Sequence, residues 1–376
     1  MRHKKNKKLG KLPCCALLLL IISAILAGCS AGPGDAPVKE NSKGALPPEA
    51  SIGAFGEAQE PYKIVTTIFP PYDWLREIIG DDVAQMELTL LGEGVDLHSY
   101  EPTVDDMITI SSCDLFIYVG GESDQWVQDA LDSDAGEEMI VINLLEVLGD
   151  QIKEEEIIEG MKPERGEEGE DTDFIGNVES QNGRREEITA PDEHVWLSLK
   201  NARILVQYIS KQLGNLDPVN AEIYDQNAAA YDEKLAALDA EYQGMIDSAP
   251  GDTLLFADRF PFRYLVDDYD LNYYAAFAGC SAETEASFET IVFLAEQLDA
   301  RQLQYVIIID TSDRALADTI IQSTADGNQE VLILDSMQSV NAAEVSGGIT
   351  YLSVMQKNLD VLREALGGDP RDEMPA

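Results

Sequence analysis

Residues 63–79 read KIVTTIFPPYDWLREII, and this stretch decides the fold. Residues 63–69 are rich in β-branched and apolar side chains, as in a strand, and residues 72–79 follow a helical pattern. The same order recurs through the first half of the chain, with strand-like runs at 85–91, 114–120 and 139–145 and helical patterns at 104–111 and 124–131. Such alternation predicts a parallel sheet with helices on both faces.

The second half of the chain repeats this alternation after a long helical stretch. Apolar residues recur every three or four positions over residues 199–213 and again over 223–245, which predicts two helices, the second one long. Strand-like runs then lie at 253–257, 273–277, 305–310 and 331–335, and helical patterns at 262–267, 287–298, 313–323 and 351–366.

We therefore expect an α/β protein of two lobes, at residues 62–195 and 251–376. Each lobe is a mostly parallel sheet flanked by helices, and a rigid helical connector at 196–250 joins them. Open parallel sheets bind ligands outside the carboxyl ends of their strands. The ligand site is therefore expected in the cleft where the two lobes face each other.

The first 28 residues have the features of a secretory signal peptide. A basic start and an apolar run lead into Leu26-Ala27-Gly28-Cys29. This ending resembles the lipobox of bacterial lipoproteins, which implies that Cys29 becomes the first mature residue and carries lipid. An uncleaved membrane anchor and ordinary signal cleavage are the alternatives. Residues 29–61, rich in Gly, Pro and Ala, predict a flexible tether.

The chain is strongly acidic, with a formal charge of −44 that becomes more negative once the basic signal peptide is removed. Such a chain is repelled by nucleic acid and suits a cationic ligand. Much of the charge lies in an acidic insertion at residues 150–190, which we expect to be disordered. We do not expect this insertion to carry the ligand site.

Histidine occurs at only three positions, and one of them, His3, lies in the predicted signal peptide. His98 lies in the motif Asp-Leu-His-Ser-Tyr-Glu-Pro, and His194 in Asp-Glu-His-Val-Trp-Leu. Neutral imidazole is a common ligand of zinc and of other transition metals. The two motifs therefore indicate a metal site, although hydrogen-bonded structural histidines are the alternative.

Two cysteines remain besides Cys29 after the predicted cleavage. Cys113 and Cys280 each lie beside an apolar run, which favours two buried thiols. A disulfide between them is possible outside the cytosol. Because no Cys-x-x-Cys spacing occurs, a thiolate zinc site is not expected.

From residue 63 to residue 366 the chain resembles the metal-binding lipoproteins of bacterial ABC transporters, the cluster A-I or zinc/manganese family. The resemblance rests on an ordered set of motifs. These are TTIFPPYD at 66–73, GVDLHSYEP at 94–102, DLFIYVG at 114–120 and EHVWL at 193–197. It implies that His98 and His194 are metal ligands.

The resemblance also implies ligands from the second lobe. Asp335 matches an aspartate that often follows the last strand, although it could instead cap the following turn. The family usually has His or Glu where this chain has Arg259, whose guanidinium cannot donate a lone pair to a metal. Asp258 is then the substitute candidate, unless it pairs with Arg259 or another arginine. Water or Asp310 are the other options.

These features together predict a lipid-anchored receptor on the outer face of the bacterial cytoplasmic membrane. It captures Zn²⁺, or alternatively Mn²⁺, for a membrane permease with an ATPase partner, as the resemblance implies. No nucleophile elbow, phosphate loop or His-Glu-x-x-His motif is present, so an enzyme is not expected. A surface adhesin with a structural metal is the second possibility.

Overall fold

The computed structural model describes residues 60–80, 86–132, 139–161, 178–179, 185–186, 190–280 and 286–367. The predicted signal peptide, the predicted lipidation site Cys29 and most of the predicted tether lie outside these residues. Within the described part, no helix combines the length and the apolar character that a membrane crossing requires.

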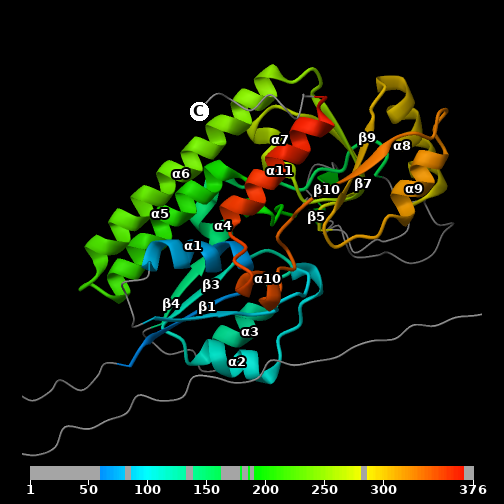
Figure 1. Ribbon diagram of the computed structural model, residues 1–376. Helices are drawn as coiled ribbons and strands as arrows, with labels where there is room; N and C mark the ends of the chain where they lie inside the picture. Colours follow the sequence, from blue (N-terminus) through cyan, green and yellow to red (C-terminus); the bar gives the residue numbers. More distant parts are fainter. Residues whose placement is uncertain are drawn as a thin grey trace, which may run out of the picture. The chain divides into compact units, whose positions relative to one another are not determined.

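The N-terminal sheet has four parallel strands in the order β2-β1-β3-β4 (Figure 1). Its strands are β1 (Tyr62–Thr66), β2 (Met86–Leu90), β3 (Leu115–Tyr118) and β4 (Ile140–Asn143), and its helices are α1 (Phe69–Ile79), α2 (Val104–Ser111), α3 (Trp126–Asp132) and α4 (Leu144–Leu148). Alternate strand residues point to opposite faces. Ile64 and Ile117 belong to the main core on one face, whereas Val65 and Phe116 pack in a smaller cluster with side chains of α2 and α3.

The C-terminal sheet repeats the plan, with parallel strands in the order β10-β9-β7-β8. Its strands are β7 (Thr253–Phe260), β8 (Asn272–Ala278), β9 (Tyr305–Ile309) and β10 (Glu330–Leu334), and its helices are α7 (Arg263–Asp268), α8 (Phe288–Arg301), α9 (Ala315–Gln322), α10 (Ala342–Ser346) and α11 (Tyr351–Ala365). The predicted α/β class is therefore confirmed. Three details differ from the prediction: β7 continues to Phe260, and the short helices α4 and α10 were not foreseen.

Two antiparallel neighbours, α5 (Leu199–Leu216) and α6 (Ala221–Ser248), form the predicted helical connector. The 28-residue α6 reaches both halves (Figure 1). Near its start, the Asn227 amide donates to the Ile78 carbonyl of α1 at 3.0 Å. Further along, the Tyr242 hydroxyl donates to the Met355 carbonyl of α11 at 2.6 Å. One continuous helix is thus bonded to helices of both sheets, which favours small relative motions.

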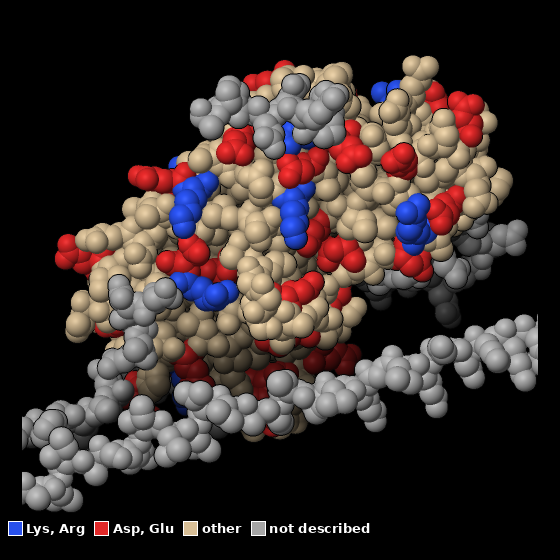
Figure 2. Space-filling view, in the orientation of Figure 1, with Lys and Arg blue, Asp and Glu red and all other residues tan. Residues whose placement is uncertain are grey.

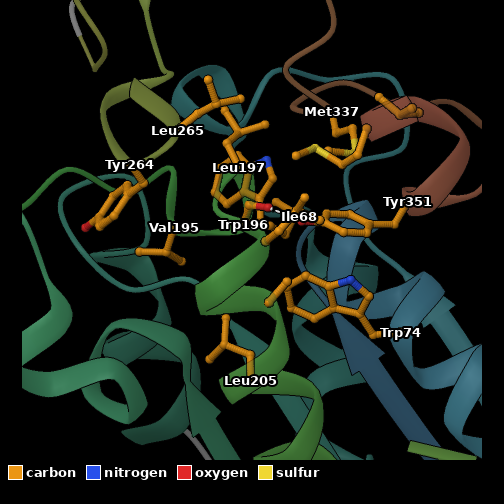
Figure 3. Close-up of a cluster of buried hydrophobic side chains, with 14 of the residues drawn as sticks. Ile68, Trp74, Val195, Trp196, Leu197, Leu205, Tyr264, Leu265, Met337 and Tyr351 are labelled. Atoms are coloured by element: carbon orange, nitrogen blue, oxygen red, sulfur yellow. Dashed lines mark hydrogen bonds between the residues drawn. The ribbon is translucent and has the colours of Figure 1, made fainter. Parts of the chain in front are cut away.

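The main hydrophobic core continues from one half to the other (Figure 3). Its centre is Trp196, whose indole N–H donates to the Ser336 carbonyl at 2.9 Å. The Tyr351 hydroxyl donates to the Trp196 carbonyl at 2.6 Å, and the Tyr351 ring lies edge-on to Trp74 at 5.3 Å between centroids. Because interiors are close-packed, this shared core also opposes a wide opening between the sheets.

The beginning of the predicted acidic insertion is part of the fold. The Lys153 amide donates to the Tyr264 hydroxyl at 3.1 Å, and the Lys153 carbonyl accepts from the Asp192 amide at 2.8 Å. Met161 is buried. The start of the insertion therefore lies against α7 and the His194 segment, and most of its remainder lies outside the described residues. Figure 2 shows the other acidic side chains spread over the visible face, with Lys and Arg among them.

Candidate metal centre

His98 is placed at the carboxyl edge of the N-terminal sheet. It lies in the short 3-10 turn η1 (Leu97–Ser99), in the loop that follows β2. The Asp96 carboxylate accepts from the His98 amide at 3.0 Å and so caps this turn. The side chain is largely buried, with 8% of its surface exposed, so its ring is held in a fixed environment.

The Nδ1 atom of His98 already has polar partners. Its Nδ1 lies 2.7 Å from the Ser123 hydroxyl and 3.7 Å from the Glu193 carboxylate. Glu193 is itself fixed, because its Oε1 accepts from the Ser123 amide at 2.9 Å. This arrangement leaves Nε2 as the ring atom that points to the site.

His194 is fully buried and directly precedes the 3-10 turn η3 (Val195–Leu197). Its Nδ1 lies 3.0 Å from Asp192 Oδ1, and the same oxygen accepts from the His194 amide at 2.9 Å. A carboxylate that accepts from Nδ1 keeps the proton there and leaves the lone pair on Nε2. Asp192 therefore selects the tautomer that can bind a metal.

The two free ring nitrogens face each other, with His98 Nε2 3.1 Å from His194 Nε2. Two imidazoles on one tetrahedral Zn²⁺, at a Zn–N distance of about 2.05 Å, have their nitrogens about 3.3 Å apart. The spacing in this protein is therefore close to that of a zinc-bound pair. The structure brings together the two histidines that the sequence singled out.

Two side chains from the C-terminal sheet complete this group. The Sγ of Cys280, which follows β8, and one ring nitrogen of each histidine all lie within 4.8 Å of one another. The Gln338 amide, from the loop after β10, lies 2.9 Å from His194 Nε2. The group thus lies between the carboxyl edges of both sheets, as predicted for the ligand site.

The electrostatic environment keeps His98 neutral. Burial, the nearby His194 ring and Arg259 lower the pKa of His98 to about 3. Burial also raises the pKa of Glu193, and that of the Cys280 thiol, which lies near the carboxylates of Glu155, Glu193 and Asp192. A neutral imidazole keeps its lone pair for a metal, and a metal ion displaces the thiol proton when it binds.

The aspartates predicted as ligands from the second half have backbone amides as partners. Asp335 Oδ1 accepts from the Met337 amide at 2.9 Å, as in the capping alternative. Both oxygens of Asp258 accept from backbone amides, that of Arg259 at 2.8 Å and that of Ile309 at 3.0 Å. Among the described residues, neither aspartate belongs to the group around the two histidines.

Arg259 lies in β7 and reaches across to the N-terminal half. Its guanidinium donates to Asp96 Oδ2 at 2.7 Å, beside the turn that holds His98. Asp310, the other carboxylate considered, accepts from the amide and the hydroxyl of Ser336 at 2.8 and 2.9 Å. The position where relatives were expected to have a ligand therefore holds a structural ion pair.

Sequence reasoning missed Cys280 and Gln338. Of the two buried thiols that were expected, Cys113 is free and buried, whereas Cys280 is free but only partly buried. The sequence did carry one signal for Cys280, because Gly279-Cys280 directly follows a predicted strand, at the sheet edge where ligands bind. Gln338 had no such signal, because glutamine is a rare metal ligand and lies 144 residues from His194.

The family model for "Zinc-uptake complex component A periplasmic" matches residues 64–365. The zinc-binding lipoprotein AdcA of Streptococcus pneumoniae is 29% identical over 308 residues, which cover 82% of this chain and 56% of AdcA. The high-affinity zinc uptake system protein ZnuA of Bacillus subtilis is 27% identical, with 81% of this chain and 87% of ZnuA covered.

Among solved structures, the Zn(II)-bound ZnuA-like domain of S. pneumoniae AdcA is similar, with a TM-score of 0.60 and 27% identity. The match covers 81% of this chain and 99% of that domain. This chain thus spans about half the length of whole AdcA and nearly all of its ZnuA-like domain. The matched family is described as a transport component, which agrees with the expectation of a protein that is not an enzyme. The shared fold and the match over residues 64–365 show that the chain belongs to the family of the periplasmic A component of zinc-uptake complexes.

Proposed function

We propose that this protein is the solute-binding component of a zinc importer and that His98 and His194 bind the zinc ion. The observation that supports this most directly is the facing pair of Nε2 atoms 3.1 Å apart. Each of these rings is oriented through Nδ1 by a fixed polar partner, as is usual for metal-bound histidines. The zinc-binding relatives AdcA and ZnuA support zinc as the ion.

Capture then proceeds with little rearrangement. Before zinc binds, the two Nε2 atoms contact each other, and that of His194 also contacts the Gln338 amide. Because Asp192 holds the His194 proton on Nδ1, His98 Nε2 donates in this contact; when zinc binds both Nε2 atoms, the His98 proton moves through solvent to Nδ1. Ser123 and Asp192 keep the rings in place. Because the helix α6 and the core around Trp196 join both halves, the motion is confined to the loops around the site.

The ion is passed on to a membrane permease that is driven by an ATPase, the partners expected for a component of a zinc-uptake complex. The protein acts outside the cytoplasmic membrane and is held there by lipid on Cys29. The anchor keeps the receptor close to the permease, and the acidic surface attracts cations to it.

Calorimetry on the metal-free chain from Ser30 onward tests this function. Zinc is expected to bind tightly with one ion per chain. The double variant His98→Ala, His194→Ala is expected to lose more than about 100-fold in zinc affinity, because even outer-shell partners of a ligand are worth 10–100-fold. Glu101→Gln, an exposed change in the same motif as His98, serves as the matched control and is expected to bind like wild type.

Unchanged zinc affinity in the double variant, with the fold intact by circular dichroism, would disprove the site. A zinc ion that chelators cannot remove, and whose loss unfolds the chain, would contradict transport. Such a result would favour the adhesin with a structural metal.

A further inference from the structure

The thiol of Cys280 lies beside the two histidines, in the loop that follows β8. Its Sγ lies within 4.8 Å of a ring nitrogen of His98 and of His194. We propose that Cys280 is the third zinc ligand and makes the receptor select zinc over manganese, with the amide oxygen of Gln338 as the fourth ligand. This proposal rests on the proposed function, because it concerns the same ion.

Zinc is usually four-coordinate, so two histidines leave two positions to fill. The oxygens of Asp258 are bound to backbone amides, and Arg259 is bound to Asp96. Asp335 lies outside the group of described side chains that contains the histidines. Among the described residues, Cys280 is therefore the one further anionic donor grouped with both rings.

The backbone around Cys280 is built for a close approach to His194. A Cβ on Gly279 would lie 2.8 Å from the Phe260 carbonyl oxygen and 3.2 Å from Cε1 of the His194 ring. Only glycine therefore lets this loop pass the ring. The Cys280 amide donates to Glu155 Oε1 at 2.7 Å, which fixes the loop from the far side.

The distances require only a small contraction when the ion binds. A thiolate and an imidazole on one tetrahedral zinc have S and N about 3.6 Å apart, from Zn–S and Zn–N distances of about 2.3 and 2.05 Å. In the protein, Sγ lies within 4.8 Å of one nitrogen of each ring. Rotation of the Cys280 side chain can shorten these distances to about 3.6 Å. On binding, the Zn–S bond forms, and the thiol proton leaves to the solvent.

Gln338 can present its oxygen to the same ion. Its amide nitrogen is placed 2.9 Å from His194 Nε2, and a turn of the amide exchanges the nitrogen and oxygen positions. The amide is neutral, so the thiolate is the only anion bound to the ion. Soft thiolate ligands favour zinc, whereas manganese prefers carboxylate and water oxygens. Cys280 is thus the residue that determines specificity.

Cobalt(II) is the probe that tests this assignment, because a Co–S bond gives a strong charge-transfer absorption in the near ultraviolet. The metal-free chain from Ser30 onward is loaded with Co²⁺ and then titrated with Zn²⁺ and Mn²⁺. Wild type is expected to show the absorption. Cys280→Ser is expected to lose it, together with more than about 100-fold in zinc affinity, whereas manganese affinity changes by less than about threefold.

Cys113→Ser is the matched control. Cys113 is the other free thiol, its Sγ lies 3.5 Å from Met139 Sδ, and the variant is expected to keep both the absorption and the affinity. In a second variant, Cys280→Asp, the carboxylate is expected to restore metal binding and to narrow the preference for zinc over manganese. This variant tests specificity even if Cys280→Ser folds poorly.

The outcomes separate this inference from the proposed function. Tight zinc binding without the cobalt absorption, and with unchanged zinc affinity in Cys280→Ser, would overturn the role of Cys280 and leave the zinc receptor standing. Failure of the wild-type protein to bind zinc at all would overturn both.

Discussion

The two sides of the metal centre use their carboxylates differently. On the N-terminal side, Asp192 and Glu193 lie beside the histidine rings, at 3.0 Å from Nδ1 of His194 and 3.7 Å from Nδ1 of His98. On the C-terminal side, Asp258, Asp310 and Asp335 all accept from backbone amides. The first group orients the two histidine rings, whereas the second holds the ends of strands in place.

This difference shows that the location of a residue at the correct sheet edge does not make it a ligand. The strand ends of a parallel sheet leave backbone amides that need acceptors. Asp258 and Asp310 meet that need, and Asp335 does the same in the turn after β10. Among the described residues on this side, the thiol of Cys280 and the amide of Gln338 are the groups that lie next to the histidine rings.

The largest effect expected from this comparison concerns the pH dependence of stability at Asp335. Burial and the charge of Asp310 raise the pKa of Asp335 from 3.8 to about 6. A carboxyl group with a raised pKa binds its proton more tightly in the folded state, so its ionisation costs stability. As the pH rises from about 4 to about 6, the free energy of unfolding of the metal-free wild type should therefore fall by up to about 3 kcal/mol relative to that of Asp335→Asn. This figure follows from 1.36 kcal/mol per pKa unit.

Urea unfolding of the metal-free proteins between pH 4 and pH 7 measures this difference. Asp318→Asn, at an exposed position on α9, is the control and should leave the wild-type pH profile unchanged. The zinc affinity of Asp335→Asn is expected to stay within about threefold of wild type, or under 0.7 kcal/mol. If Asp335→Asn lowers zinc affinity more than 100-fold, Asp335 is a ligand, and the difference between the two sides does not hold.

The next effect concerns the carboxylates that serve the histidines. Asp192→Asn keeps the size of the side chain but removes the charge that holds the proton on Nδ1 of His194. We expect zinc affinity to fall 10–100-fold, or about 1.4–2.7 kcal/mol, as for other outer-shell partners of metal ligands. Calorimetry with Asp105→Asn, an exposed change on α2, as the control measures this loss. Wild-type affinity in Asp192→Asn would mean that the tautomer is fixed by other contacts.

Most of the fold could be predicted from the sequence, because its strands and helices carry strong local patterns. All eight strand-like runs correspond to β1–β4 and β7–β10 of the two parallel sheets. The misses have local causes. The five-residue helices α4 and α10 are too short for a helical period and depend on caps at Asn143 and Asn341. The continuation of β7 through Arg259 depends on its irregular pairing with β8.

The site could be predicted only in part. The two histidines stand out because histidine is rare in this chain and because their motifs are distinctive. The ion pair of Arg259 could not be predicted from local motifs, because its partner Asp96 lies 163 residues away in the sequence. The position of Cys280 depends on the loop at Gly279 and on Glu155, which lies in a segment expected to be disordered. Such contacts arise from tertiary packing and leave no local pattern.

The smallest effect is expected at Arg259, at the position where the resemblance led us to expect a ligand. Its guanidinium and Asp96 form an ion pair at 2.7 Å, with 18% and 15% of the side chains exposed. Arg259→Ala removes a positive charge near the bound cation and leaves Asp96 bonded to the His98 amide. Zinc affinity should therefore rise, by no more than about tenfold or 1.4 kcal/mol, because solvent and salt screen a partly exposed charge.

Calorimetry at low and high salt measures this rise, which should shrink as salt screens the charge. Arg314→Ala, an exposed change at the start of α9, is the control. It also removes one positive charge and should not alter zinc affinity. Arg259→Lys keeps the charge and should bind zinc as wild type does. If Arg259→Ala instead weakens zinc binding more than 100-fold, the ion pair with Asp96 is needed to hold His98 in place. The C-terminal side would then orient a ligand as well, and the contrast between the two sides would fail at this residue.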